Sequence, residues 1–151
     1  MGNWSMDDVA ARLMAKDNAF SIRAQKILRD DGVRRNGTAE LWRVLCEAYR
    51  EYCRDFNRTP VISTSMVYDP TGNQFTLGRP DAPDKLRGVV HPDRSEVRIT
   101  LVSPESKPYV KTIRVRISDD DGSYYFADEV GAGATDIDEV VRRSVDALLG
   151  I

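Results

Sequence analysis

Residues 38–58 of the chain read TAELWRVLCEAYREYCRDFNR, and this stretch decides the fold. Apolar side chains recur in it three and four residues apart, which places them on one stripe of an α-helix. A second stripe, rich in aromatic residues and cysteine, runs beside the first. The two stripes consist of Leu41, Leu45, Ala48, Tyr52 and Phe56, and of Trp42, Cys46, Tyr49 and Cys53. A face this broad must be covered, either by the rest of the chain or by a partner.

The predicted helix has a start signal and a stop signal. Asn36-Gly37 is typical of a turn, and the Thr38 hydroxyl is placed to cap the first helical amides. Pro60 ends the helix because it pushes Thr59 toward extended geometry. Cys46 and Cys53 lie about two helical turns apart, roughly 10 Å along the axis, so they are predicted to stay free thiols.

Two further amphipathic segments are predicted upstream. Ser5 is a predicted N-cap, and apolar residues at helical spacing follow it: Met6, Val9, Ala10, Leu13 and Met14. The second segment covers roughly residues 18–30, and Gly32 is its predicted end. Asp17-Asn18 is either a break between two helices or part of one longer helix, and the sequence leaves both interpretations open. The helical part of the chain is thus predicted to span residues 5–58.

From Pro60 onward the apolar period changes from 3.6 to 2, which predicts a β-meander over residues 61–127. Asp69-Pro70-Thr71-Gly72 has the residue order of a type I turn. The predicted strands are 61–68, a short strand with Phe75 and Leu77, 86–91, 96–103, 109–118, and a sixth around Tyr124 and Phe126.

A last helix is predicted over residues 136–149, with Thr135 and Asp138 as a capping box. The predicted fold is α+β: one domain, 1–151, with a five- or six-stranded antiparallel meander. N-terminal helices and the C-terminal helix are expected to pack on one face of that sheet.

Composition and the N-terminal sequence predict a location. With 41% hydrophobic and 30% charged residues, the chain has the composition of a soluble globular protein. No apolar run approaches the roughly 20 residues that cross a bilayer. The first residues do not form a signal peptide, and Gly2 lacks the Ser or Thr at position 6 that N-myristoylation requires, since Met6 stands there. We therefore expect a cytoplasmic protein with no membrane partner.

The formal net charge of −2 conceals an uneven distribution. Residues 1–58 hold 11 basic and 9 acidic side chains, residues 59–118 hold 9 and 6, and residues 119–151 hold 2 and 9. A basic sheet beside an acidic C-terminal part favours a dipolar surface and self-association over a single basic field for nucleic acid.

The candidate binding residues lie on the polar side of the predicted sheet. Arg98, Arg114 and Arg116 alternate with apolar residues that face the helices, so they are expected to project from the opposite side, with Arg87 and Tyr125 beside them. Arginines next to an aromatic ring can grip phosphates or stack on bases. The alternative is a solvated face on which the arginines pair with acids such as Glu96 across strands.

Other motifs do not support a catalytic, metal or cofactor site. Gly131-x-Gly133 lacks the third glycine of a dinucleotide-binding loop and precedes acidic residues. Asp119-Asp120-Asp121-Gly122 fits a hairpin turn better than a calcium loop. His91 is the only histidine and would have to serve Cys46 or Cys53, both expected on a buried face.

Three functions follow from these observations. The leading prediction is a non-catalytic binding or adaptor protein that acts through protein–protein contacts, with a homodimer as one form of it. The second is a nucleic-acid- or anion-binding module that uses the arginine-bearing face. The third is a small-ligand pocket between Trp42, Tyr49, Tyr52 and the sheet. None of these three functions is catalytic, so enzyme activity is not expected.

Overall fold

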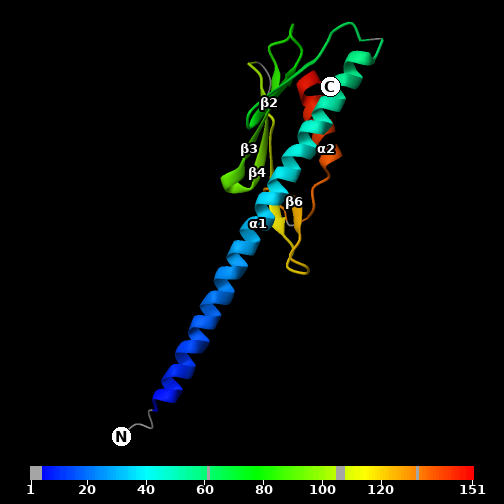
Figure 1. Ribbon diagram of the computed structural model, residues 1–151. Helices are drawn as coiled ribbons and strands as arrows, with labels where there is room; N and C mark the ends of the chain where they lie inside the picture. The colour runs from blue at the N-terminus through cyan, green and yellow to red at the C-terminus, as the bar shows by residue number, and fades with distance from the viewer. Residues whose placement is uncertain (1–4, 61, 105–107, 132) are drawn as a thin grey trace.

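A computed structural model describes residues 5–60, 62–104, 108–131 and 133–151. Within these ranges the chain forms one six-stranded antiparallel sheet with a long helix before it and a shorter helix after it (Figure 1). The strands lie in the sheet in chain order, with a 3-10 turn between β3 and β4. The elements are α1 (Met6–Arg58), β1 (Val67–Thr71), β2 (Gln74–Gly78), β3 (Lys85–His91), η1 (Pro92–Arg94), β4 (Glu96–Val102), β5 (Val110–Ile117), β6 (Tyr124–Asp128) and α2 (Ile137–Leu149).

The predicted fold class, α+β with an antiparallel meander, an N-terminal helical part and a C-terminal helix, is confirmed. Gly2, Val61, residues 105–107 and Ala132, the middle residue of Gly131-x-Gly133, lie outside the described residues, so the predictions that concern them stay predictions.

α1 is one continuous helix of 53 residues, so the predicted end at Gly32 and the predicted turn at Asn36-Gly37 are wrong. Thr38 does not cap a helix start, because its hydroxyl donates to the Arg34 carbonyl oxygen at 2.7 Å inside the helix. The Ser5 cap is confirmed: Ser5 Oγ accepts from the Asp8 amide at 3.1 Å. The predicted stop is confirmed too, since the helix ends at Arg58, ahead of Pro60.

Gly37 lies in the middle of α1, at a place where the helix packs tightly against the sheet. A Cβ atom at this position would lie 2.6 Å from Val115 Cγ1 and 2.8 Å from Tyr124 Cγ. The glycine thus permits a close approach of helix and sheet and makes no turn. Gly32 differs, since an added Cβ there would meet nothing within 4 Å.

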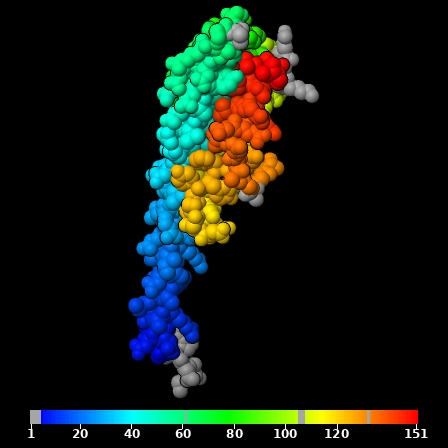
Figure 2. Space-filling view, turned by 90° about the vertical axis from the view of Figure 1, so that its right-hand side faces the viewer, coloured from blue at the N-terminus to red at the C-terminus, as the bar shows by residue number. Residues whose placement is uncertain are grey.

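The sheet is too small to cover the whole of α1. Fifty-three helical residues extend about 80 Å, whereas the longest strand, with eight residues, extends about 27 Å. The buried residues of α1 accordingly begin at Gly37 and end at Phe56. Residues 6–31, which we call the rod, project beyond the sheet, as the blue end of the chain shows in Figures 1 and 2. In the rod every side chain is exposed except those of Val9, Ala24 and Asp30, which are partly buried.

The rest of α1 packs on the sheet through a cluster of aromatic rings. Phe75 is fully buried, and its ring centroid lies 5.6 Å from that of Trp42, 4.9 Å from Tyr49 and 5.5 Å from Tyr68. Gly88 is paired with Phe75 in the sheet, and a Cβ there would overlap the ring at 2.2 Å. The ring therefore lies flat over the neighbouring strand, and α1 rests on it.

α2 lies beside α1 on the same face, and a buried hydrogen bond joins the two helices. Ser144 Oγ donates to the Val141 carbonyl oxygen at 2.8 Å, so the Tyr49 hydroxyl donates to Ser144 Oγ, also at 2.8 Å. Both helices and the inner side of the sheet contribute to a single hydrophobic core.

Further local predictions are wrong at the first strand and at the start of α2. The first strand begins at Val67, and Asp69 and Pro70 lie within it, so the turn is Gly72-Asn73 with Gly72 at φ +63°. Proline is tolerated because β1 is an edge strand. The N-cap of α2 is Asp136 in place of Thr135, since the Asp136 carboxylate accepts from the backbone amides of Asp138 and Glu139.

Candidate functional site

The structure places the five candidate binding residues on the outer face of the sheet. Arg98 and Arg114 each lie between two buried residues that face the helices, and Arg116 is paired with Tyr125 across β5 and β6. Arg87 occupies the equivalent polar position on β3. The geometric part of the expectation is thus met, while binding by these residues stays a prediction.

Three of these arginines, Arg87, Arg114 and Arg116, already have partners within the chain. Arg114 Nε lies 3.3 Å from Glu96 Oε2, and its terminal nitrogen lies 3.2 Å from Glu129 Oε1. The Glu96 side chain is only 2% exposed, so this arginine covers a buried carboxylate. Arg87 donates to Gln74 Oε1 at 2.8 Å, and Arg116 donates to the carbonyl oxygens of Asp128 and Glu129. Cross-strand pairing, the second of the two interpretations, accounts for these contacts.

His91 and the two thiols are not brought together. His91 is paired with Glu96 on the outer face, whereas Cys46 and Cys53 are free thiols on α1, on the opposite side of the sheet. Burial raises the pKa of both thiols, which disfavours the thiolate that a nucleophile needs. Cys53 instead donates to the Met66 carbonyl oxygen at 3.2 Å.

The acidic turn between β5 and β6 has a structural explanation. Asp121 accepts from both the amide and the hydroxyl of Ser123, at 3.0 and 2.7 Å, and the Ser123 hydroxyl lowers the pKa of Asp121. Gly122 adopts φ +72°, as a tight turn requires. Among the described residues no group of three His, Cys, Asp or Glu side chains is placed to hold a metal ion.

The rod carries most of the large apolar side chains that are exposed in the described part of the chain. Its exposed side chains include Leu13 at 55%, Phe20 at 72% and Ile27 at 61%. They follow one another at helical spacing, together with Met6, Val9, Ala10, Ala24 and Leu28. We call this set the rod stripe. Ile22 is also apolar and exposed, but it lies on the opposite side of the helix.

The rod stripe continues into the buried face of the same helix. From Ile27 the steps of three and four residues lead through Asp31 and Arg35 to Thr38 and Leu41, which are buried. The sequence shows the apolar spacing of the rod, and this spacing predicts helices packed on the sheet. The rod is a surface because α1 is longer than the sheet that could cover it. The length of α1 in turn depends on the helix being continuous across Gly37.

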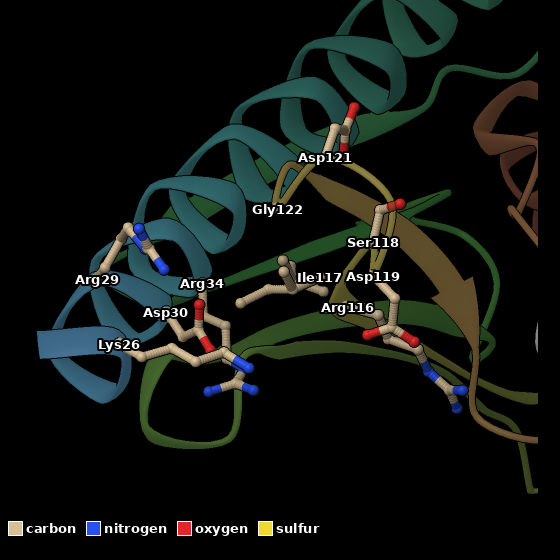
Figure 3. A pocket seen from close by; sticks show the side chains of 11 residues that line it. Lys26, Arg29, Asp30, Arg34, Arg116, Ile117, Ser118, Asp119, Asp121 and Gly122 are labelled. Atoms are coloured by element: carbon tan, nitrogen blue, oxygen red, sulfur yellow. The ribbon is translucent and has the colours of Figure 1, made fainter. Parts of the chain in front are cut away.

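Two polar grooves flank the base of the rod. One, of about 760 Å³, lies between α1 and the β5–β6 turn, with Lys26, Asp30 and Arg34 on its helix wall and Asp119 on the other (Figure 3). Its charges are mixed. The other, of about 600 Å³, lies between α1 and η1, where the rod stripe meets the sheet. It holds two aspartates, Asp31 and Asp93, and five arginines, Arg34, Arg35, Arg94, Arg114 and Arg116, and we call it the arginine groove.

The residues of the predicted small-ligand pocket lie in different surroundings. Trp42 borders a cavity of about 210 Å³ together with Thr38 and Val90. Tyr49 is fully buried against Phe75, and its pKa is raised mainly by that burial. Core packing therefore accounts for Tyr49, and a ligand pocket between Trp42, Tyr49, Tyr52 and the sheet stays a prediction.

Comparison with known proteins gives no match to a family model, a curated protein or a solved structure. Among the described residues, no helix combines the length and apolar character that crossing a bilayer demands.

Proposed function

We propose that the chain is a non-catalytic interaction protein in which the α+β domain holds the rod out as a binding element for another polypeptide. The observation that carries this proposal is the rod stripe, an apolar surface at helical spacing that no other described segment covers. Contiguous exposed apolar surface of this kind is typical of protein–protein contact sites.

The energetics of the rod support a partner. A helix without tertiary contacts is only marginally stable in water, because most helical stability in proteins comes from packing of an apolar face. Full burial of a Leu, Ile or Phe side chain contributes about 1.5–3 kcal/mol. Covering Leu13, Phe20 and Ile27 would therefore supply stability that these side chains do not give while they are exposed.

The charge of the rod favours a protein over a membrane or nucleic acid. Residues 6–31 contain five basic and five acidic side chains. Helices that lie on membranes have polar faces rich in Lys and Arg, and nucleic-acid binding needs an excess of positive charge. A balanced polar face beside an apolar stripe is the pattern of a helix that pairs with another helix.

The rigid base of the rod suits a presenting role. Gly37 brings α1 into close contact with Val115 and Tyr124, and fully buried Leu41 and Leu45 follow within about two turns. The direction of the rod relative to the sheet is therefore fixed by core packing, so a partner would meet a surface with a set orientation.

The proposal is tested by photo-crosslinking in the cells that make the protein. A photoreactive amino acid replaces Phe20 on the rod stripe and, in a matched control, Ile22, which is also apolar and exposed but faces away from the stripe. We expect protein adducts from position 20 and few from position 22. Equal labelling from both positions, or no adducts from either, would contradict a binding role for the stripe.

The second candidate is an anion- or nucleic-acid-binding module that uses Arg87, Arg98, Arg114, Arg116 and Tyr125. What favours it is their common position on the outer, polar face of the sheet. This function requires nucleic-acid binding that weakens steeply as the salt concentration rises, and that also weakens in the variant Arg116→Gln. Fluorescence anisotropy with labelled single-stranded and duplex nucleic-acid probes measures both effects. No binding at low salt would end it.

A further inference from the structure

We infer that the partner of the rod is a second copy of this chain, and that the two rods pair antiparallel along their rod stripes. This inference rests on the proposed function and adds to it the identity and the direction of the partner. Three observations carry it: where the sheet lies relative to the stripe, which residues interrupt the stripe, and the charges at its two ends.

The sheet blocks a parallel pair. The rod stripe and the buried stripe of α1 are continuous and lie on one side of the helix. From Thr38 onward this side rests on the sheet, and in the rod the same side faces the partner. In a parallel pair the second copy of α1 would run on along that side into the space that the sheet of the first copy occupies. In an antiparallel pair the second helix leaves in the opposite direction, past the N-terminus of the first, and the two sheets lie at opposite ends.

The acids within the stripe also oppose a parallel pair. Asp17 and Asp31 interrupt the apolar spacing on the contact side of the helix. A parallel, in-register pair would place each of them against its own copy, and like charges at such positions disfavour that arrangement. Antiparallel pairing places each opposite a different residue, so neither aspartate meets its own copy.

The two ends of the rod have complementary charges. Asp7 and Asp8 occupy its first turn and are exposed. The arginine groove lies at its other end, in line with the stripe through Asp31 and Arg35. The rod is about 39 Å long, so antiparallel overlap along most of it brings the acidic first turn of each copy to the arginine groove of the other. This attraction acts twice in a twofold-symmetric pair.

The direction of pairing is tested by disulfide crosslinking of the full chain. The parent variant carries Cys46→Ser and Cys53→Ser, with an unchanged circular dichroism spectrum as the folding check. Leu13→Cys and Ile27→Cys are made separately in it, and the two are oxidised alone and after mixing under reducing conditions. Antiparallel pairing predicts a disulfide dimer from the mixture and little from either variant alone, since the two copies of one position then lie too far apart for a disulfide.

Parallel pairing predicts the reverse, namely dimers from each variant alone, and this result would overturn the inference. So would a single-chain mass for the unmodified protein at every concentration in sedimentation equilibrium. A dimer by mass without the mixed disulfide would also overturn the antiparallel direction.

The contact between the rod end and the arginine groove is tested by charge reversal with rescue. Asp7→Lys/Asp8→Lys and Arg34→Glu/Arg35→Glu are each expected to raise the dimer dissociation constant about tenfold, because like charges then meet at both ends. An equimolar mixture of the two variants restores opposite charges at both ends of each heterodimer, so we expect heterodimers to form in preference to either homodimer. Weakened homodimers without rescue in the mixture would contradict this contact.

The photo-crosslinking experiment separates this inference from the proposed function. Adducts from position 20 at twice the mass of the chain support both. Adducts only with other proteins leave the rod as a binding element but overturn the second copy as its partner. No adducts overturn both.

Discussion

The two halves of α1 carry the same apolar spacing, but one half is buried and the other is exposed. From Thr38 to Phe56 the stripe is buried under a sheet and a second helix, and from residue 6 to residue 31 the same stripe is exposed. The difference does not come from the helix, which is continuous. It comes from the size of the sheet, which covers only the part of α1 within its reach. An apolar stripe therefore predicts that a face will be covered and does not say by what.

The largest expected difference between the halves is in the free energy of unfolding when one large apolar side chain in each half is truncated. Leu45→Ala removes a fully buried side chain and should lower the free energy of unfolding by about 2–5 kcal/mol. Phe20→Ala removes a side chain that is 72% exposed and should change it by less than about 0.5 kcal/mol. Urea denaturation of dilute protein, followed by Trp fluorescence, measures both. Equal destabilisation by the two variants would show that the rod packs within its own chain.

The two glycines of α1 give a second matched pair. Gly37→Ala introduces a Cβ 2.6 Å from Val115 Cγ1, in a packed core, and we expect a loss of about 1–3 kcal/mol. Gly32→Ala meets nothing within 4 Å and should increase helical stability by up to about 1 kcal/mol. Thermal unfolding of both variants checks the signs. Stabilisation by Gly37→Ala would mean that the helix does not approach the sheet as closely as described.

Tyr49→Phe probes the link from the buried half to α2. It removes the donor to Ser144 Oγ, while Ser144 keeps its bond to the Val141 carbonyl oxygen. We expect a loss of about 1 kcal/mol, the net contribution of one hydrogen bond. Ser144→Ala provides the reciprocal measurement. A double variant as stable as either single variant would place both effects in this one contact.

The smallest effect is expected at the free end. Ser5→Ala removes the acceptor for the Asp8 amide and should cost about 1 kcal/mol of local helix stability. Because the rod makes few contacts with the sheet, far-UV circular dichroism at low protein concentration should decrease while the unfolding midpoint of the domain stays constant. A lowered midpoint would contradict the independence of the two halves.

Much of the fold follows from the sequence because it depends on local patterns. The change of period at Pro60, the alternation around Ile99 and Ile113 and the Ser5 cap all act within a few residues, and the structure bears them out. The errors lie where a distant contact overrides local preference. Gly37 has the local character of a turn, but its role is set by Val115 and Tyr124, which are far from it in the chain.

The candidate site is predictable only in part. Alternation along the strands suffices to place Arg98, Arg114 and Arg116 on the outer face, and cross-strand pairing suffices to name Glu96 as a partner of these arginines. The exposure of the rod does not follow from the sequence, because the spacing of Leu13, Phe20 and Ile27 is the same whether a helix is buried or exposed.

The most direct test of the rod as a surface for a second copy is hydrogen exchange along α1 as a function of protein concentration. Amides from Thr38 to Phe56 should be protected at every concentration, because the sheet of the same chain covers them. Amides of the rod should exchange rapidly in dilute protein and become protected as the concentration rises, since their cover is a second copy. Rod amides that are equally protected at all concentrations, or unprotected at all of them, would contradict it.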